Sequence, residues 1–532
     1  MAGKSLRLTA LLSLYLLVVA GGGLGLAAFG LHQYQVTATP SLTPLNPLQR
    51  LELMEAVSAY NHSDMATALP IFTRLAALGD ARSETDLGRM YGCGCGVPED
   101  VDRAFALQTQ AAAQHYGKAE DNLGWMYAER GDEISATHWF WLSAQHGDAN
   151  GEADLGRQFH RGYSMPRDDA QAVYWFGLSA AQSNTKGEYW LGTAYETGAG
   201  VTPDHAHAIR LFKAAAAQGE SASMCELGTM YEDGTGVGRD YAAAMRWYQR
   251  AADEGNDCGY TGIGFLYDLG LGVPQSETAA LQWYEAAAKD GDSTGENDVG
   301  AMYHRGAGGV SQDFAQAAYW FGLAANQGDA YGEMNLATLY INGQGVEHND
   351  VLAFMLDQKA AAQDEPHAEE QLGNAYRLGY ATKVDYAQAA KYYTAAAKHG
   401  LAQSQAALAY LYETGQGVPR DDEQAYKWYL ISQFVTVHPV MEDDERCKEF
   451  AALPELNLAD IKSNITQAQM VKAQAEADDW AAAHRPLHEP ESPPRRPVWP
   501  LYITTVILLG LLLLLRLYHA CVKENPQNLD NV

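Results

Sequence analysis

One five-residue motif, Leu-Gly-x-x-Tyr, returns along this chain at an almost constant interval. Its leucine, or an equivalent apolar residue, stands at positions 87, 123, 155, 191, 227, 263, 299, 336, 372 and 408. The interval is 36 residues in seven of the nine cases, with one interval of 32 and one of 37. A unit of this length cannot bury its apolar face alone, so neighbouring units must supply its core. The chain is therefore predicted to be an array of about ten repeats.

Each repeat is predicted to hold two helices. The first carries the Leu-Gly motif, and the second carries a pair of large apolar residues such as Trp283-Tyr284, of which we expect Trp283 to be a core residue between units. The loop between the helices reads Gly-x-Gly-Val, and its glycines supply the positive φ that ends the first helix. Seven residues before each apolar pair stands a residue suited to cap the second helix. These ten residues are Asp100, Asp132, Asp168, Asp204, Asp240, Ser276, Asp313, Asn349, Asp385 and Asp421. Because the 32-residue unit keeps its cap at Asp132, its deletion is placed in the loop alone.

These landmarks, in register over residues 80 to 435, resemble the Sel-1-like repeat (SLR) family, a branch of the tetratricopeptide superfamily. The resemblance implies an all-α fold, a right-handed α-solenoid of about ten helix pairs whose inner surface binds other proteins. Ala337 and Ala409, which replace the motif glycine, depart from the family pattern.

Both ends of the chain contain long uncharged segments. Residues 8–31 carry no charge and follow Lys4 and Arg7, which predicts either a membrane anchor or a signal segment, with the uncleaved anchor favoured. Residues 497–515 are also uncharged and flanked by aromatic residues, which predicts a transmembrane helix. Since Lys4 and Arg7 hold the N-terminus in the cytoplasm, the middle of the chain is predicted to lie outside it.

The resulting domain organisation has eight parts. They are an N-terminal anchor or signal segment (1–34), a linker (35–50), a degenerate capping repeat (51–79), ten repeats (80–435), a C-terminal capping helical region (436–482), a proline-rich linker (483–496), a transmembrane helix (497–518) and a tail (519–532).

The charge balance excludes one class of partner. The chain has 36 basic and 66 acidic residues, a formal net charge of −30, and its basic residues are scattered. Nucleic acid would need a concentrated basic surface, so we exclude it and expect protein partners, of basic character. No catalytic, cofactor or metal motif stands out, because no glycine loop continues into Gly-Lys-Ser/Thr and the histidines are dispersed. We therefore expect no enzyme activity and no cofactor.

A glutamate recurs three residues before the motif leucine. It is present at Glu84, Glu120, Glu152, Glu188, Glu296, Glu333 and Glu369. Stacked repeats would align these carboxylates into a column that attracts a basic partner. The favoured alternative is structural, because negative charge in the first turn of a helix is stabilised by about 0.3 to 1 kcal/mol.

Two residues after the motif leucine the side chain varies, and three repeats place an aromatic ring there. Trp125, Phe265 and Tyr410 are candidate anchors for a protein ligand, because the resemblance implies that this position faces the groove. Packing against a neighbouring helix is an equally weighted alternative.

The cysteines give a weaker signal. Cys93 and Cys95 in the first loop would form either a redox-active disulfide or a soft-metal site, and a structural or incidental role is favoured over both. Cys225 and Cys258 lie in successive first helices at different motif positions, so no bridge between them is expected.

The sequence thus predicts a membrane-anchored, extracytoplasmic interaction scaffold of a bacterial envelope. One alternative, if the source is eukaryotic, is a lumenal adaptor of a membrane ubiquitin-ligase complex in endoplasmic-reticulum-associated degradation. Another alternative is an envelope hydrolase, although no nucleophile with a base stands out.

Overall fold

The structure is a computed structural model that describes residues 45–433, 458 and 461–483. Within these residues it is all-helical, with no strand. The 23 helices are α2 (Pro47–Asn61), α3 (Met65–Ala76), α4 (Ala81–Cys93), α5 (Val101–Ala112), α6 (Gly117–Glu129), α7 (Glu133–Gln145), α8 (Ala149–Arg161), α9 (Asp169–Ala181), α10 (Thr185–Thr197), α11 (His205–Ala217), α12 (Ser221–Asp233), α13 (Tyr241–Asp253), α14 (Asp257–Leu269), α15 (Glu277–Lys289), α16 (Ser293–Arg305), α17 (Phe314–Asn326), α18 (Ala330–Asn342), α19 (Asp350–Ala361), α20 (Pro366–Leu378), α21 (Tyr386–Lys398), α22 (Ala402–Thr414), α23 (Asp422–Ser432) and α25 (Gln467–Ala483).

The predicted caps of the second helices are confirmed. Asp100, for example, accepts a hydrogen bond from the backbone N–H of Arg103 at 2.9 Å, and the hydroxyl of Ser276 accepts one from Ala279 at 3.3 Å. The short repeat also keeps its cap, since Asp132 accepts from the N–H of Ser135 at 3.0 Å. Because each cap satisfies a free amide of the first turn, it fixes where the second helix begins.

Most first helices end at a glycine in the left-handed conformation, as predicted. In α12, Gly234 has φ +79°, and its N–H bonds back to the carbonyl of Met230. The short repeat differs, because α6 ends at Arg130 without a left-handed cap and reaches Asp132 through Gly131 alone. The loop deletion is therefore confirmed.

The core of most repeats is built from the motif leucine and the second residue of the apolar pair. Tyr248, Phe321, Tyr393 and Tyr429 are buried. The prediction for Trp283 was wrong in this respect: its ring is only partly buried and stacks on Tyr260 at 6.0 Å between centroids. The helical register turns the second residue of the pair inward and leaves the first at the edge of the core.

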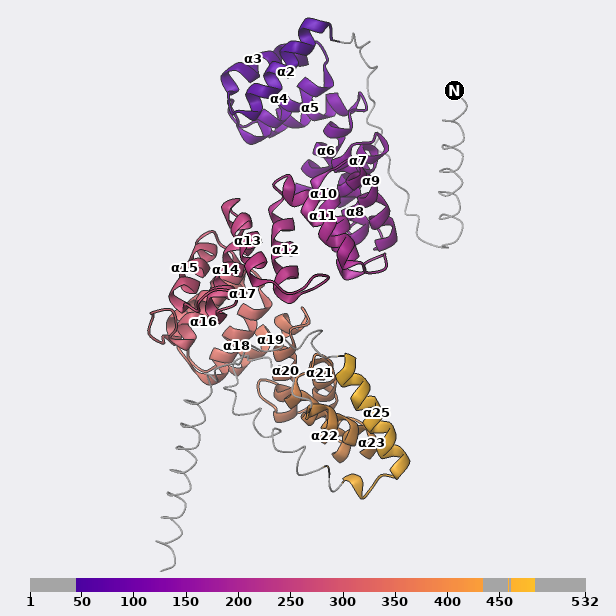
Figure 1. Cartoon of the computed structure of the whole chain (residues 1–532), viewed down its shortest axis with the longest axis vertical. Helices are drawn as coiled ribbons and strands as arrows, with labels where there is room; N and C mark the ends of the chain where they lie inside the picture. The colour runs from indigo at the N-terminus through magenta and orange to yellow at the C-terminus, as the bar shows by residue number, and fades with distance from the viewer. Residues whose placement is uncertain (1–44, 434–457, 459–460, 484–532) are drawn as a thin grey trace, which may run out of the picture. The chain divides into compact units, whose positions relative to one another are not determined.

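The described residues divide into two compact units, one that ends at Trp283 and one that begins at Tyr284. Within each unit the helices pack in chain order, with the two helices of one repeat in contact and the second helix also contacting the next repeat (Figure 1). The first helices of neighbouring repeats also contact each other directly, as in α4 with α6, α6 with α8, and α8 with α10. The described residues thus show the stacked helix pairs expected of a solenoid.

The ends of the array are covered by further helices. Helices α2 and α3 precede the first full repeat and pack on it, and α25 packs on α23. Among the described residues, no helix is both long and apolar enough to cross a membrane. The two predicted membrane segments, 1–34 and 497–518, lie outside the described residues.

Candidate functional site

One side of the first helices forms a continuous surface that we call the first-helix face. It consists of the residues five before, one before and two after the motif leucine, which lie on one side of a helix because they are spaced i, i+4 and i+7. In α4, α6, α8 and α10 these residues are Arg82, Asp86, Arg89, Lys118, Asn122, Trp125, Asn150, Asp154, Arg157, Lys186, Trp190 and Thr193.

Asp86 organises the beginning of this face. Its carboxylate lies 3.7 Å from Arg89, 3.9 Å from Lys118 of the next repeat and 4.0 Å from Arg82. Burial raises the pKa of Asp86, and the three cations oppose this shift. Because the cations remain substantially exposed, they are available to a ligand while they hold the buried carboxylate.

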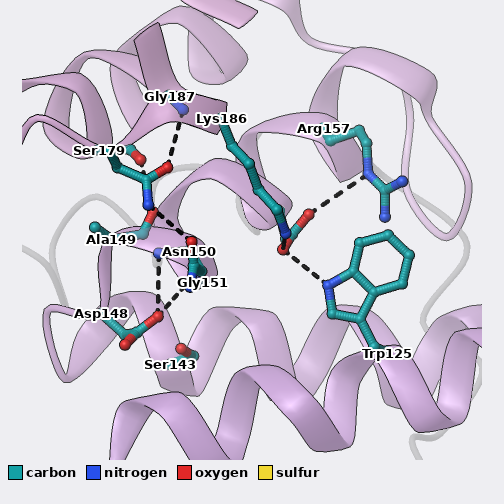
Figure 2. Close-up of polar contacts among 12 residues, drawn as sticks. Trp125, Ser143, Asp148, Ala149, Asn150, Gly151, Arg157, Ser179, Lys186 and Gly187 are labelled. Carbon is teal, nitrogen blue, oxygen red and sulfur yellow. Dashed lines mark hydrogen bonds and ion pairs between the residues drawn. The ribbon is translucent and has the colours of Figure 1, made fainter. Parts of the chain in front are cut away.

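Asp154 has the same role two repeats later. Its buried carboxylate accepts a hydrogen bond from Trp125 Nε1 at 2.9 Å and pairs with Lys186 Nζ at 2.9 Å and with Arg157 at 3.8 Å. Figure 2 shows Trp125, Arg157 and Lys186 converging on one carboxylate. The guanidinium of Arg157 lies 4.3 Å from the centroid of the Trp125 ring, a cation–π contact. Beside this cluster, burial and then the charge of Asp154 raise the pKa of Asp121 well above its usual range.

The first-helix face of α4 to α10 therefore carries a local excess of positive charge. Its five cations are 22 to 49% exposed at the side chain, whereas Asp86 and Asp154 are 8% and 4% exposed. This local excess contrasts with the net charge of −30 of the whole chain. Sequence analysis missed it, although basic residues at two fixed motif positions of the first four repeats are a readable signal.

The three aromatic candidates lie in different surroundings. Trp125 is partly buried, lies edge-on to Phe140 at 5.9 Å, and is held by Asp154. Tyr410 is partly buried against the core of the last repeats. Phe265 is 39% exposed and is the candidate most accessible to a ligand. Their role in binding a partner remains a prediction.

The glutamate candidates Glu84, Glu120, Glu152 and Glu188 are buried, at 1 to 7% exposure. In each case a side chain near the end of the second helix of the same repeat bonds to the carboxylate. The distances are 2.7 Å from Gln114 to Glu84, 2.6 Å from His146 to Glu120, 2.8 Å from Gln182 to Glu152, and 3.1 Å from Gln218 to Glu188.

Burial also raises the pKa of each of these four carboxyl groups, to about 7 for Glu84. A buried, hydrogen-bonded carboxylate is poorly placed to attract a partner, so the structure favours the structural alternative for these residues. The signal for the glutamine partners was present in the sequence, since a glutamine follows the glutamate by 30 residues in the repeats of Glu84, Glu152 and Glu188.

One cysteine expectation needs correction, because no bridge was expected between Cys225 and Cys258. The structure bonds Cys93 to Cys95, and it bonds Cys225 to Cys258, whose α-carbons lie 6.1 Å apart. The second bridge links the first helices α12 and α14, which contact each other. Different motif positions thus come together because neighbouring first helices are offset along their axes.

Comparison with known proteins identifies the repeat. Nine segments match the sequence model described as Sel1 repeat: residues 81–116, 149–184, 185–220, 221–256, 259–292, 293–329, 330–365, 366–401 and 402–432. They cover more than half of the chain. The short repeat at 117–148 lies outside these matches, although α6 and α7 pack there as a helix pair.

Individual relatives match over shorter lengths. The chain is 40% identical over 79 residues to protein sel-1 homolog 2 of Mus musculus and 39% identical over 79 residues to that of Homo sapiens. The match covers 15% of this chain and only 12% of the length of these relatives. An uncharacterized protein of Neisseria meningitidis is 40% identical over 77 residues, which are 14% of this chain and 15% of that protein.

Two solved structures are similar over most of their own length. A protective antigen of uropathogenic Escherichia coli with an SLR fold is 28% identical, with coverage of 80% of this chain and 98% of that chain and a TM-score of 0.36. A Sel1 repeat protein of Oxalobacter formigenes is 24% identical, with coverage of 45% and 96% and a TM-score of 0.41.

Proposed function

Because the chain belongs to the Sel1 repeat family, we propose that it is a protein-interaction scaffold whose first-helix face on α4 to α10 is a docking surface. A stack of short repeats offers a long surface whose side chains differ from repeat to repeat while the framework stays the same. Such a surface suits recognition of an extended segment of another protein.

The observation that carries this proposal is the set of exposed cations around Trp125. Arg157 and Lys186 lie over its ring at 4.3 and 5.1 Å, and both are already oriented by Asp154. Preoriented cations lose less side-chain entropy on binding than free ones. We propose that the segment that docks here is acidic, with carboxylates that pair with the five cations of the face.

This partner differs from the basic partner expected from the net charge. A net charge of −30 acts over long distances and favours approach of basic proteins, but it is screened beyond about 8 Å at physiological ionic strength. At contact distance the local charge decides which side chains pair. A partner with a basic body and an acidic docking segment satisfies both conditions.

We also propose that the repeats lie outside the cytoplasm, anchored at one or both ends of the chain. Support comes from the uncharged segments 8–31 and 497–515 and from the bridges Cys93–Cys95 and Cys225–Cys258, since disulfides persist in oxidising compartments. A bacterial envelope is the favoured setting. Alkaline phosphatase fused after residue 440 should be active, and an inactive fusion beside a bright cytoplasmic reporter would contradict this location.

Charge reversal tests the docking surface. Photo-crosslinking from position 122 in the full chain first identifies the partner, and its affinity is then measured with Arg82→Glu/Lys118→Glu. The matched control is Arg210→Glu/Arg246→Glu, which changes the net charge equally but lies on the second helices α11 and α13. We expect the face variant to bind about tenfold or more weakly, equivalent to roughly 1.4 kcal/mol, and the control to bind normally. Equal losses in both variants would contradict docking at this face.

A further inference from the structure

Two histidines and a glutamate come together in the short repeat. His115 lies in the turn before α6, Glu120 is in the first turn of α6, and His146 caps the end of α7. One potential ligand atom from each of the three lies within 4.8 Å of the others. His146 Nδ1 is 2.6 Å from Glu120 Oε2, and the two imidazole rings are 4.8 Å apart between centroids.

The other repeats show how this cluster arises. In the repeat of Glu188, the side-chain amide of Gln218 bonds both to the carboxylate at 3.1 Å and to the backbone carbonyl of Ser183 at 3.3 Å. Gln327 bonds in the same way to Glu296 at 2.8 Å and to the carbonyl of Gly291 at 3.0 Å. In the short repeat, His146 stands where the glutamine stands, and His115 occupies the turn position of Ser183 and Gly291.

The turn position brings the second imidazole to the carboxylate. This position has a positive φ in each of these repeats, +60° at His115 and +87° at Gly291. A non-glycine residue there costs backbone energy. In the other repeats one glutamine amide bonds both the carbonyl of this turn residue and the carboxylate of the glutamate, so the turn residue lies close to that carboxylate. A histidine at this turn therefore brings its imidazole near Glu120.

We propose that His115, Glu120 and His146 bind a divalent transition-metal ion, with zinc as the best fit. Two imidazoles and a carboxylate are a common set of three protein ligands for zinc, and they leave a fourth position for water or for a group from a partner. Both histidines are exposed, so an ion can enter, whereas Glu120 is 1% exposed and already fixed. Asp148 adds further negative charge near Glu120.

The geometry requires only a small closure. Three atoms bound to one zinc ion at about 2.0 to 2.2 Å lie roughly 3.3 Å apart in a tetrahedral site. The most distant pair of ligand atoms, up to 4.8 Å apart, must approach, and the 2.6 Å contact between His146 Nδ1 and Glu120 Oε2 must widen. Both histidines are exposed, so their rings have room to turn. Magnesium and calcium prefer an all-oxygen set and should be rejected.

The residues that other repeats carry at these two positions define a variant that removes both histidine ligands and keeps the repeat intact. His115→Gly restores the residue that other repeats use at the positive φ, and His146→Gln restores the amide that clamps the glutamate elsewhere. The double variant should therefore fold at least as well as the natural chain. A matched control is His399→Gln, which alters the histidine 4.0 Å from Glu369 in a repeat whose corresponding turn residue is Asp364.

The test is titration of the purified full chain, in detergent, with Zn²⁺ and with Co²⁺, whose absorption spectrum reports its ligands. We expect the natural chain and His399→Gln each to bind one Zn²⁺ ion tightly and to melt at a higher temperature when Zn²⁺ is bound. Excess Mg²⁺ should not displace the bound Zn²⁺. In His115→Gly/His146→Gln the affinity should fall by at least about tenfold, the smallest loss that changes around a metal site commonly produce. Equal zinc binding by the double variant, or no tight site in the natural chain, would overturn the proposal.

Discussion

The ring of Phe176 lies so close to Gly156 that a Cβ atom at position 156 would be 2.6 Å from two ring carbons. Gly156 is the motif glycine of α8, and Phe176 is the second residue of the apolar pair in α9. The same approach recurs between Gly300 and Phe321, at 2.7 Å. In repeats with a motif glycine, the missing side chain therefore gives the ring the space it occupies.

Gly156→Ala should destabilise its repeat by about 1 to 3 kcal/mol, because the added methyl group overpacks the core. Gly177→Ala is the control, since that helical glycine has no atom within 4 Å of the added Cβ. It should stabilise the helix by up to about 1 kcal/mol. Amide hydrogen exchange over residues 149–181 should be faster in Gly156→Ala and slower in Gly177→Ala than in the natural chain. Equal protection in both variants would contradict the packing argument.

Local features of the fold were predictable because each depends on a few neighbouring residues. A cap such as Asp204 acts on the amide of His207, three residues away, so spacing alone reveals it. The bridge between Cys225 and Cys258 was not predicted, because it depends on how helix α14 is offset along its axis from helix α12. No local sequence pattern indicates that offset. The hydrogen bond from Trp125 to Asp154 was not predictable in the same way, because it depends on a residue of the next repeat.

Stability should fall as pH rises from about 4.5 to 7. Burial raises the pKa of Glu84 and of Glu369 to about 7 from a usual 4.5, so between these values the folded state holds more protons than the unfolded state. Above pH 7 the buried carboxylates are ionised and their contribution to stability is lowest. Melting curves at pH 5 and pH 8 measure the difference.

Glu84→Gln tests the assignment of this effect. An uncharged amide at position 84 can still accept the hydrogen bond from Gln114 and has no buried charge at pH 8. The variant should melt higher than the natural chain at pH 8 and nearly equally at pH 5. Glu99→Gln, at an exposed position of the same repeat, should change neither melting temperature. A larger gain in melting temperature at pH 5 than at pH 8 would contradict the predicted direction of the pH dependence.

The Cys225–Cys258 bridge closes a loop with a sequence separation of 33 residues. Loop-closure entropy places its contribution at about 3 to 4 kcal/mol at most. Reduction should lower the melting temperature of the natural chain by more than that of Cys225→Ser/Cys258→Ser, in which Cys93–Cys95 is the bridge that remains among the described residues. Alkylation of the unreduced chain followed by mass spectrometry checks the pairing directly, because both cysteines should stay unmodified. Labelling at either one would rule out the bridge.

The last prediction separates binding from stability on the first-helix face. Phe265 is 39% exposed, so Phe265→Ser should change the free energy of unfolding by only about 0.5 kcal/mol. Trp125→Phe keeps a ring but removes the indole N–H that Asp154 accepts, which should cost about 1 to 2 kcal/mol. If Phe265 anchors a partner, Phe265→Ser weakens capture while the melting temperature is preserved, since an exposed ring contributes most when a partner desolvates it. A stable Phe265→Ser chain that captures its partner fully would exclude this ring from the binding surface.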